Sequence, residues 1–168
     1  MKSFKSFLLE DTDIFDPEHE FKNRSVGIMS AERGNLNFTE NEKRTENLHN
    51  DLNKLNHKVV KAHGVFIENY GKKDARPVKE NTFIVMHKKE GDDGGELLGH
   101  LKSLGRKYEQ DSILHKGYNT NEAFFHGTNK TGYPGEGNTD SVGTLRMNET
   151  GEFHTRLQDG RTFRFRKD

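Results

Sequence analysis

Apolar residues recur every three or four positions in two stretches of the chain, a spacing that lines them up on one face of a helix. The first stretch follows Thr39-Glu-Asn-Glu42, and the second follows Asp93-Gly-Gly-Glu96. Both have the order of a capping box, in which side chains satisfy free N–H groups of the first turn, so we expect a helix to begin at each. The two stripes consist of Leu48, Leu52, Leu55 and Val59, and of Leu97, Leu101, Leu104 and Tyr108.

Eight other stretches are rich in β-branched and aromatic residues, or alternate between apolar and polar positions, as is typical of strands. Asp159-Gly160 separates the last two and favours a tight hairpin, because both turn positions need a positive φ. Alternation across this hairpin places apolar side chains on one face and arginines on the other. The expected strands cover 25–34, 58–68, 80–89, 111–115, 123–127, 142–147, 152–158 and 161–166.

Together these elements predict an α+β fold. It would be a single small domain over 26–168, with a mixed or antiparallel sheet, two main helices and a C-terminal β-meander at 142–166. The glycine-rich residues 127–141 are expected to form a surface loop, because they lack the Gly-Lys-Ser/Thr order of a phosphate-binding loop. Residues 11–25 are acidic and show no period, so we expect a linker or a loosely attached arm.

Composition narrows the classes of function. The 168 residues suffice for one domain, and an apolar content of 29% predicts a thin core. The 27 basic and 27 acidic residues cancel, which removes any global attraction to nucleic acid or to an anionic membrane. The lack of cysteine excludes disulfides, thiolate–zinc sites and Fe–S clusters, and no apolar run approaches the roughly 20 residues of a transmembrane helix. We expect no cofactor and no membrane partner.

The first ten residues have the pattern Met-Lys-x-Phe-x-x-Phe-Leu-x-Glu. A short helix there would carry Phe4, Phe7 and Leu8 on one side, where they could dock in a groove of a partner. The pattern resembles the capsid-targeting sequence of the internal head proteins of T4-like tailed bacteriophages. The resemblance implies a propeptide over 1–10 that directs the chain to the prohead scaffold. The prohead protease would then cut between Glu10 and Asp11, although that family usually has a small residue after the cut.

This resemblance also implies a location and a role. The mature chain would be held in the virion, inside the phage head, and could be delivered with DNA into the host cytoplasm. There it would bind a host defence or regulatory protein. Two alternatives stay open: a small enzyme, either a hydrolase or a nucleotide-modifying enzyme, and a cytoplasmic interaction domain without a phage context. The sequence favours a binding protein over an enzyme without deciding between them.

Three short segments are similar to a small bacterial domain family of unknown function, over about residues 25–128. They are Asn41-Glu-Lys-Arg44 in the first expected helix, Glu80-x-x-Phe83 at the start of a strand, and Tyr108-Glu-Gln110-x-Ser112 after the second helix. The resemblance implies an α+β fold and names no reaction.

Candidates for chemistry are sparse. The nine histidines show neither His-x-x-x-His nor His-Glu-x-x-His spacing, so we expect no metal site. Histidines on the expected strands could still converge with a carboxylate. If the chain is an enzyme, its candidate residues are Glu80, His63, His87 and Gln110.

The arginine-bearing face of the last hairpin is the one local basic feature. Guanidinium groups there could contact phosphates, including those of DNA, through bidentate hydrogen bonds. A solvated face that protects a sheet edge is the explanation that we favour. The residues concerned are Arg156, Arg164 and Arg166.

Overall fold

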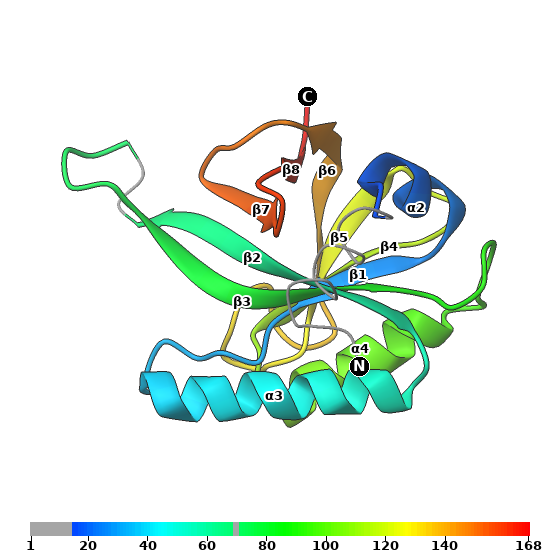
Figure 1. The fold of residues 1–168 in the computed structure, drawn as a ribbon, viewed down its shortest axis with the longest axis horizontal. Helices are drawn as coiled ribbons and strands as arrows, with labels where there is room; N and C mark the ends of the chain where they lie inside the picture. Colours follow the sequence, from blue (N-terminus) through cyan, green and yellow to red (C-terminus); the bar gives the residue numbers. More distant parts are fainter. Residues whose placement is uncertain (1–14, 69–70) are drawn as a thin grey trace.

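Eight strands pair antiparallel and close into a barrel in the computed structural model, which describes residues 15–68 and 71–168 (Figure 1). Their order around the barrel is β1-β3-β2-β7-β8-β6-β5-β4, and β1 closes the ring by pairing with both β3 and β4. The strands are β1 Val26–Met29, β2 Lys58–Glu68, β3 Arg76–Met86, β4 Ser112–Lys116, β5 Glu122–Gly127, β6 Thr139–Met147, β7 Phe153–Leu157 and β8 Thr162–Arg166.

The predicted α+β domain with a C-terminal meander is therefore wrong. The last three strands are not a meander, because β8 lies between β7 and β6 and β7 continues to β2. Closure depends on pairings between distant segments: Gly27 lies opposite both Val85 and His115, and Ala62 lies opposite Leu157. Local periodicity carries no information about such pairings, so it cannot distinguish a closed barrel from other sheets.

The described residues contain three helices: α2 Pro17–Asn23, α3 Phe38–Lys54 and α4 Glu96–Lys107. Helix α3 begins earlier than the capping-box pattern predicts, because the side chain of Asn37, rather than that of Thr39, accepts a hydrogen bond from a first-turn N–H. Helix α4 begins at Glu96 with Gly95, rather than Asp93, at the N-cap, although the side chain of Asp93 accepts the N–H of Leu97 at 2.9 Å. None of these three helices is long and apolar enough to cross a membrane.

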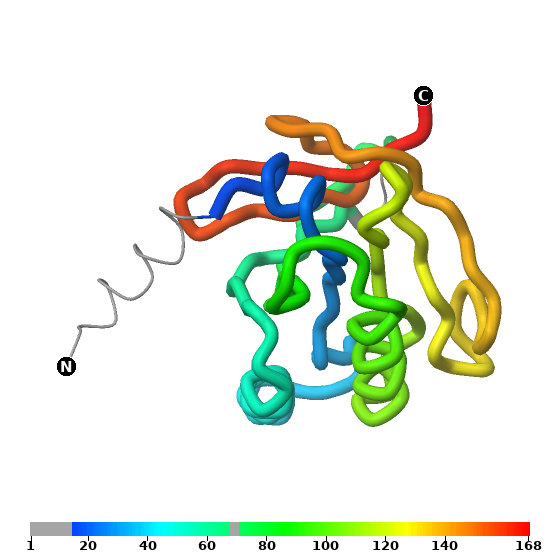
Figure 2. Tube along the Cα trace, turned by 90° about the vertical axis from the view of Figure 1, so that its right-hand side faces the viewer, coloured from blue at the N-terminus to red at the C-terminus, as the bar shows by residue number. Residues whose placement is uncertain are grey.

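Apolar side chains pack on both faces of the barrel wall. Helices α3 and α4 lie next to each other against its outer face, α4 on β1 and β4 and α3 on β2 and β3 (Figure 2). Gly27 lets α4 approach β1 closely, since a Cβ there would lie 2.0 Å from Cδ1 of Leu101. The outer cluster includes Met29, Leu48, Leu52, Phe83, Val85, Leu97, Leu101, Leu104, Tyr108 and Ile113.

Helix α2 belongs to the inner core, although residues 11–25 were expected to form a linker or a loose arm. Phe15 and Phe21 are buried, and the ring of Phe21 lies 5.3 Å from that of Phe163 and 5.8 Å from that of Phe165. The buried ammonium group of Lys116 donates a hydrogen bond to the carbonyl of Phe21. Helix α2 therefore fills part of the barrel interior.

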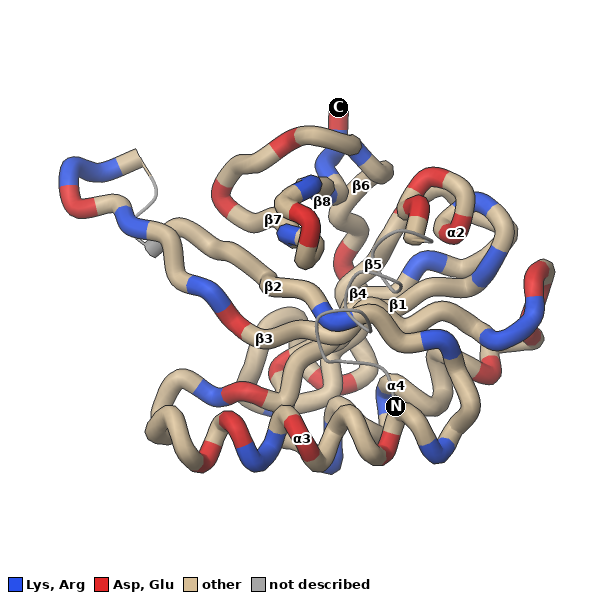
Figure 3. Tube along the Cα trace, viewed as in Figure 1, with Lys and Arg blue, Asp and Glu red and all other residues tan. Residues whose placement is uncertain are grey.

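The hairpin predicted at Asp159-Gly160 is confirmed, because β7 and β8 pair with Thr155 opposite Phe163. Its turn differs from the predicted one, since Gly160 has a positive φ and Asp159 does not. Strands β2 and β3 pair over eleven residues each, and their far ends project beyond the barrel in Figure 1. Basic and acidic positions are interspersed along the described chain (Figure 3). The predicted propeptide, residues 1–10, lies outside the described residues.

Candidate functional site

The part of the barrel interior that α2 does not fill is a cavity of about 480 Å³. All eight strands contribute to its wall, and residues 32–35 after β1 and 109–111 after α4 form its rim. Its volume falls within the 300–1,000 Å³ typical of small-molecule sites. The barrel interior therefore has room for a small-molecule ligand.

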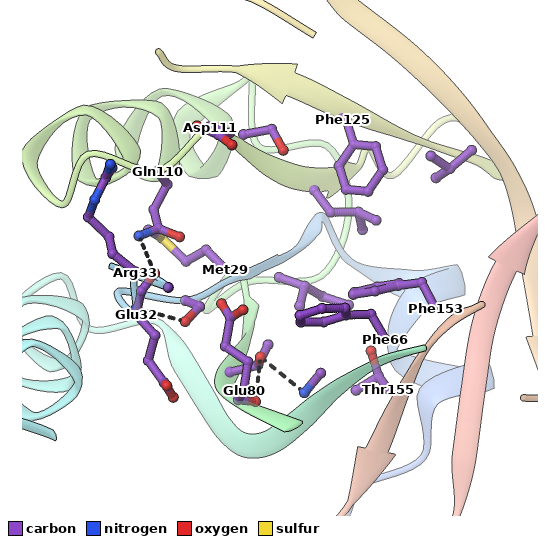
Figure 4. Close-up of a pocket in the computed structure, with 18 of the residues that line it drawn as sticks. Met29, Glu32, Arg33, Phe66, Glu80, Gln110, Asp111, Phe125, Phe153 and Thr155 are labelled. Carbon is purple, nitrogen blue, oxygen red and sulfur yellow. Dashed lines mark hydrogen bonds between the residues drawn. The ribbon is translucent and has the colours of Figure 1, made fainter. Parts of the chain in front are cut away.

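Glu80 is the half-buried carboxylate of this cavity. It extends from β3 (Figure 4), opposite Gly64 in the β2–β3 ladder. Burial raises the pKa of the Glu80 carboxyl, and the nearby carboxylate of Glu32 raises it further, whereas a hydrogen bond with Ser30 opposes the change. This electrostatic environment favours a cation close to Glu80.

The rim after β1 is held in place by α3. The guanidinium group of Arg44 donates to the carbonyl of Ala31 at 2.7 Å, and the side chain of Asn41 bonds both the N–H and the carbonyl of Arg33. Glu32 lies between these two anchored residues and accepts the N–H of Asn81. Helix α3 therefore fixes the position of a second carboxylate at the cavity.

The rim after α4 is tied to the same region. The side-chain amide of Gln110 donates to the carbonyl of Glu32 at 3.2 Å and to that of Tyr108 at 3.1 Å. Arg44 also donates to the carbonyl of Tyr108, so one arginine of α3 joins both rim segments. These bonds define the polar part of the cavity wall.

The remaining wall is aromatic. Figure 4 shows the rings of Phe66, Phe125 and Phe153 on the side of the cavity away from Gln110 and Glu32. Phe165 also contributes, and these side chains come from four different strands. Aromatic faces of this kind bind flat heterocycles by stacking.

The charges around the cavity are mostly negative. Four acidic side chains line it, against two arginines, and no histidine, lysine or tyrosine is among the described residues of the wall. The acidic residues are Glu32, Glu80, Glu109 and Asp111. The cavity thus combines an acidic end with an aromatic end, an arrangement suited to a cationic ligand that carries an aromatic ring.

In a comparison with known protein families, the chain matches the S-adenosylmethionine lyase family over residues 27–166. The chain belongs to this family. The match spans all eight strands apart from the first residue of β1, and so it includes the whole cavity. A comparison with curated proteins gives no match.

Membership in the S-adenosylmethionine lyase family favours the enzyme alternative in its general form. The structure brings together two of the four candidate residues for an enzyme, Glu80 and Gln110, in the cavity of this lyase-family barrel. The other two lie elsewhere: His63 is not part of the cavity wall, and His87 is directed to α4, where its Nε2 lies 3.0 Å from Glu96. The expected convergence of strand histidines with Glu80 does not occur, because alternate residues of a strand point to opposite faces.

Two arginines of the last hairpin already have an acidic partner. The carboxylate of Glu149 accepts hydrogen bonds from Arg164 at 3.2 Å and from Arg166 at 2.8 Å. Phosphate binding by Arg156, Arg164 and Arg166 remains a prediction, and any phosphate would compete with Glu149 for two of them.

Glu32 and the aromatic wall were missed by sequence reasoning. A signal was present, however, in the three segments similar to a bacterial family of unknown function. Arg44, Glu80 and Gln110 each come from one of those segments, and all three contact or form the polar part of this cavity.

Proposed function

We propose that this protein cleaves S-adenosylmethionine at a carbon–sulfur bond of its sulfonium group. The observation that carries the proposal is the cavity itself, in which carboxylates at one end face aromatic rings at the other. The substrate has a matching polarity: an amino-acid group and a sulfonium cation at one end, and an adenine ring at the other. The family match supports the same substrate.

The two ends of the substrate have separate places in the cavity. The adenine ring stacks between the phenylalanine side chains, with Phe66 and Phe153 as the main contacts. The ammonium group of the methionine part lies at Glu80 and Glu32, where it relieves the repulsion between their carboxylates. This orientation places the sulfonium between the polar and apolar parts of the wall.

A lyase breaks the bond without water, and the substrate can supply its own nucleophile. An oxygen of its carboxylate attacks Cγ, the new C–O bond closes a five-membered lactone, and the Cγ–S bond breaks with its electron pair going to sulfur. The products are homoserine lactone and 5′-methylthioadenosine, and no proton needs to move. The protein contributes mainly orientation, which in intramolecular reactions is worth effective concentrations of about 10⁵–10⁸ M.

Charge favours this route. The carboxylate and the sulfonium neutralise each other in the transition state, so apolar surroundings at the sulfonium stabilise the transition state relative to the charged substrate. The ammonium keeps its charge throughout, which is why the carboxylates belong there. The competing elimination needs a base strong enough to remove a Cβ proton, and the described wall offers only carboxylates.

The test is incubation of the purified full chain with S-adenosylmethionine, followed by chromatography for 5′-methylthioadenosine and NMR of the second product. The lactone and the elimination product, vinylglycine, are isomers, so NMR rather than mass distinguishes them. Glu80→Gln removes one charged contact to the ammonium and should lower kcat/KM about 10- to 100-fold. Glu18→Gln, at an exposed position of α2, is the matched control and should keep full activity.

Glu80→Gln should also stabilise the fold at neutral pH. The pKa of the Glu80 carboxyl is raised in the folded state. Its contribution to the free energy of unfolding is therefore greatest at pH values below 4.5, the pKa in the unfolded chain. This contribution is lost as the pH rises through the pKa of the folded state. Glutamine stays neutral and avoids that loss. Loss of activity together with unchanged or increased stability identifies Glu80 as a substrate contact, whereas absence of 5′-methylthioadenosine from the wild-type reaction would rule out the proposed function.

We further propose, from the first ten residues alone, that the chain is carried in a phage head and processed after Glu10. This proposal is compatible with an enzyme, because delivery and catalysis involve different parts of the chain. Mass spectrometry of purified virions tests it: the expected terminus is Asp11. An intact Met1 terminus, or absence of the protein from the particles, would contradict it. Binding to a host protein remains a separate prediction.

A further inference from the structure

A second group of polar side chains lies outside the cavity, between the first half of α4 and the turn that joins α3 to β2. His57 comes from that turn and is 7% exposed, and Glu96 and His100 are four residues apart on α4. One possible ligand atom from each residue lies within 4.8 Å of the other two. Residues four apart share a helix face, so α4 presents both of its side chains to His57.

The distance between the two imidazole rings is close to that of a metal site. Nε2 of His57 lies 2.9 Å from Nδ1 of His100. In a tetrahedral zinc site with Zn–N bonds of about 2.0–2.1 Å, two nitrogen ligands lie about 3.3 Å apart. The two nitrogens would therefore need to move about 0.4 Å further apart to reach the spacing of a tetrahedral zinc site.

A third histidine holds the carboxylate in place. The N–H of Lys89 donates to Nδ1 of His87 at 3.1 Å, which leaves the ring proton on Nε2. That nitrogen lies 3.0 Å from Oε1 of Glu96 and donates to it. Hydrogen bonds of this kind orient the carboxylate ligands of metal sites.

We infer that His57, Glu96 and His100 bind a zinc ion that links α4 to the turn between α3 and β2. Two imidazoles and a carboxylate suit zinc, and the side chain of Glu96 is 47% exposed, so an ion and a fourth, water ligand can enter from solvent. The sequence pattern misses this site because the helical pair is Glu-x-x-x-His and the third ligand comes from another element. The zinc site lies at the first half of α4, whereas the cavity residues Gln110 and Asp111 lie beyond the last residue of the same helix. The zinc would therefore stabilise the fold rather than take part in the reaction, and the inference does not depend on the proposed function.

The experiment uses the full chain, stripped with a chelator and titrated with zinc chloride against a chromogenic competitor. We expect one zinc ion per chain. His100→Gln should weaken binding about 100-fold or more, and His87→Gln, which only releases Glu96, about 10- to 100-fold. His63→Gln, on β2 and outside the group, is the matched control and should bind as the wild type does.

His57 is buried, so its replacement can unfold the chain, and the decisive variants are therefore His100→Gln and Glu96→Gln. Cobalt in place of zinc should give the intense visible absorption of a tetrahedral site in the wild type and lose it in both variants. Failure of the wild type to bind zinc stoichiometrically, wild-type affinity in both variants, or equal loss of affinity in His63→Gln would overturn the inference. The first two results would leave the histidine pair as an ordinary hydrogen bond between neutral rings.

Discussion

His115 makes the stability of this protein depend on pH in a way that one substitution can isolate. It lies on β4, is buried, and its Nε2 has no hydrogen-bond partner among the described residues. Burial, together with the neighbouring His126 and Lys116 and partly opposed by Asp93, lowers the pKa of His115 from 6.5 to about 4.

The size of the effect follows from the two pKa values. The unfolded chain takes up a proton near pH 6.5, whereas the folded chain resists protonation of His115 until about pH 4. The stabilisation by neutral His115 is therefore complete above pH 6.5 and is lost as the pH falls through that window. A difference of about 2.5 pKa units corresponds to about 3.4 kcal/mol, of which about 1.8 kcal/mol is lost between pH 7 and pH 5.

His115→Leu removes the titrating group. It breaks no hydrogen bond at Nε2, because that nitrogen has no partner among the described residues. Urea denaturation at fixed pH values gives the free energy of unfolding of each variant. Between pH 7 and pH 5, we expect this free energy to fall by about 1.8 kcal/mol less in His115→Leu than in the wild type. His19→Leu, at an exposed position of α2, controls for the loss of one histidine. Parallel curves for the wild type and His115→Leu would refute the reasoning.

Four further substitutions test the packing and the cavity. Tyr108→Phe removes the hydroxyl that donates to the carboxylate of Asp51 at 2.6 Å, and should cost about 1.5 kcal/mol in urea denaturation; a cost below about 0.5 kcal/mol would show that this bond contributes little. Gly143 and Gly160 have similar positive φ values, 89° and 92°. They differ in the space around them: a Cβ added at Gly143 would lie 2.1 Å from the backbone of β8, whereas a Cβ added at Gly160 would have no atom within 4 Å. Alanine should therefore cost about 1 kcal/mol at Gly160 and clearly more at Gly143, and equal melting temperatures would contradict this. Phe153→Ala should raise KM for S-adenosylmethionine about tenfold with little change in stability, since this ring is 44% exposed; an unchanged KM would remove it from the proposed adenine site.

The local elements were largely predictable from the sequence. The strand expected at 58–68 has those bounds in the structure, and the tight turn at Asp159-Gly160 joins β7 to β8. Both depend on side chains close together in the chain, which is the information that periodicity and turn residues carry. Even the start of α3 was displaced only because Asn37 supplies the cap earlier than Thr39 could.

The candidate site was only half predictable. Glu80 and Gln110 were chosen from the sequence, and they do share a cavity. Glu32 was not, because its place depends on Asn41 and Arg44 of α3, which hold the rim after β1 by hydrogen bonds to its backbone. No pattern within the rim itself indicates those bonds.

The sequence by itself determined the two long helices, the strands and which side chains alternate across each strand, but it missed α2. The tertiary structure alone decided that β1 pairs with both β3 and β4, and that β2 pairs with β7. These pairings close the sheet into a barrel whose interior α2 fills only in part, and that partial filling creates the cavity. The physical reason is that a strand specifies its two faces through its own residues, whereas its neighbours are selected by the packing of the whole chain.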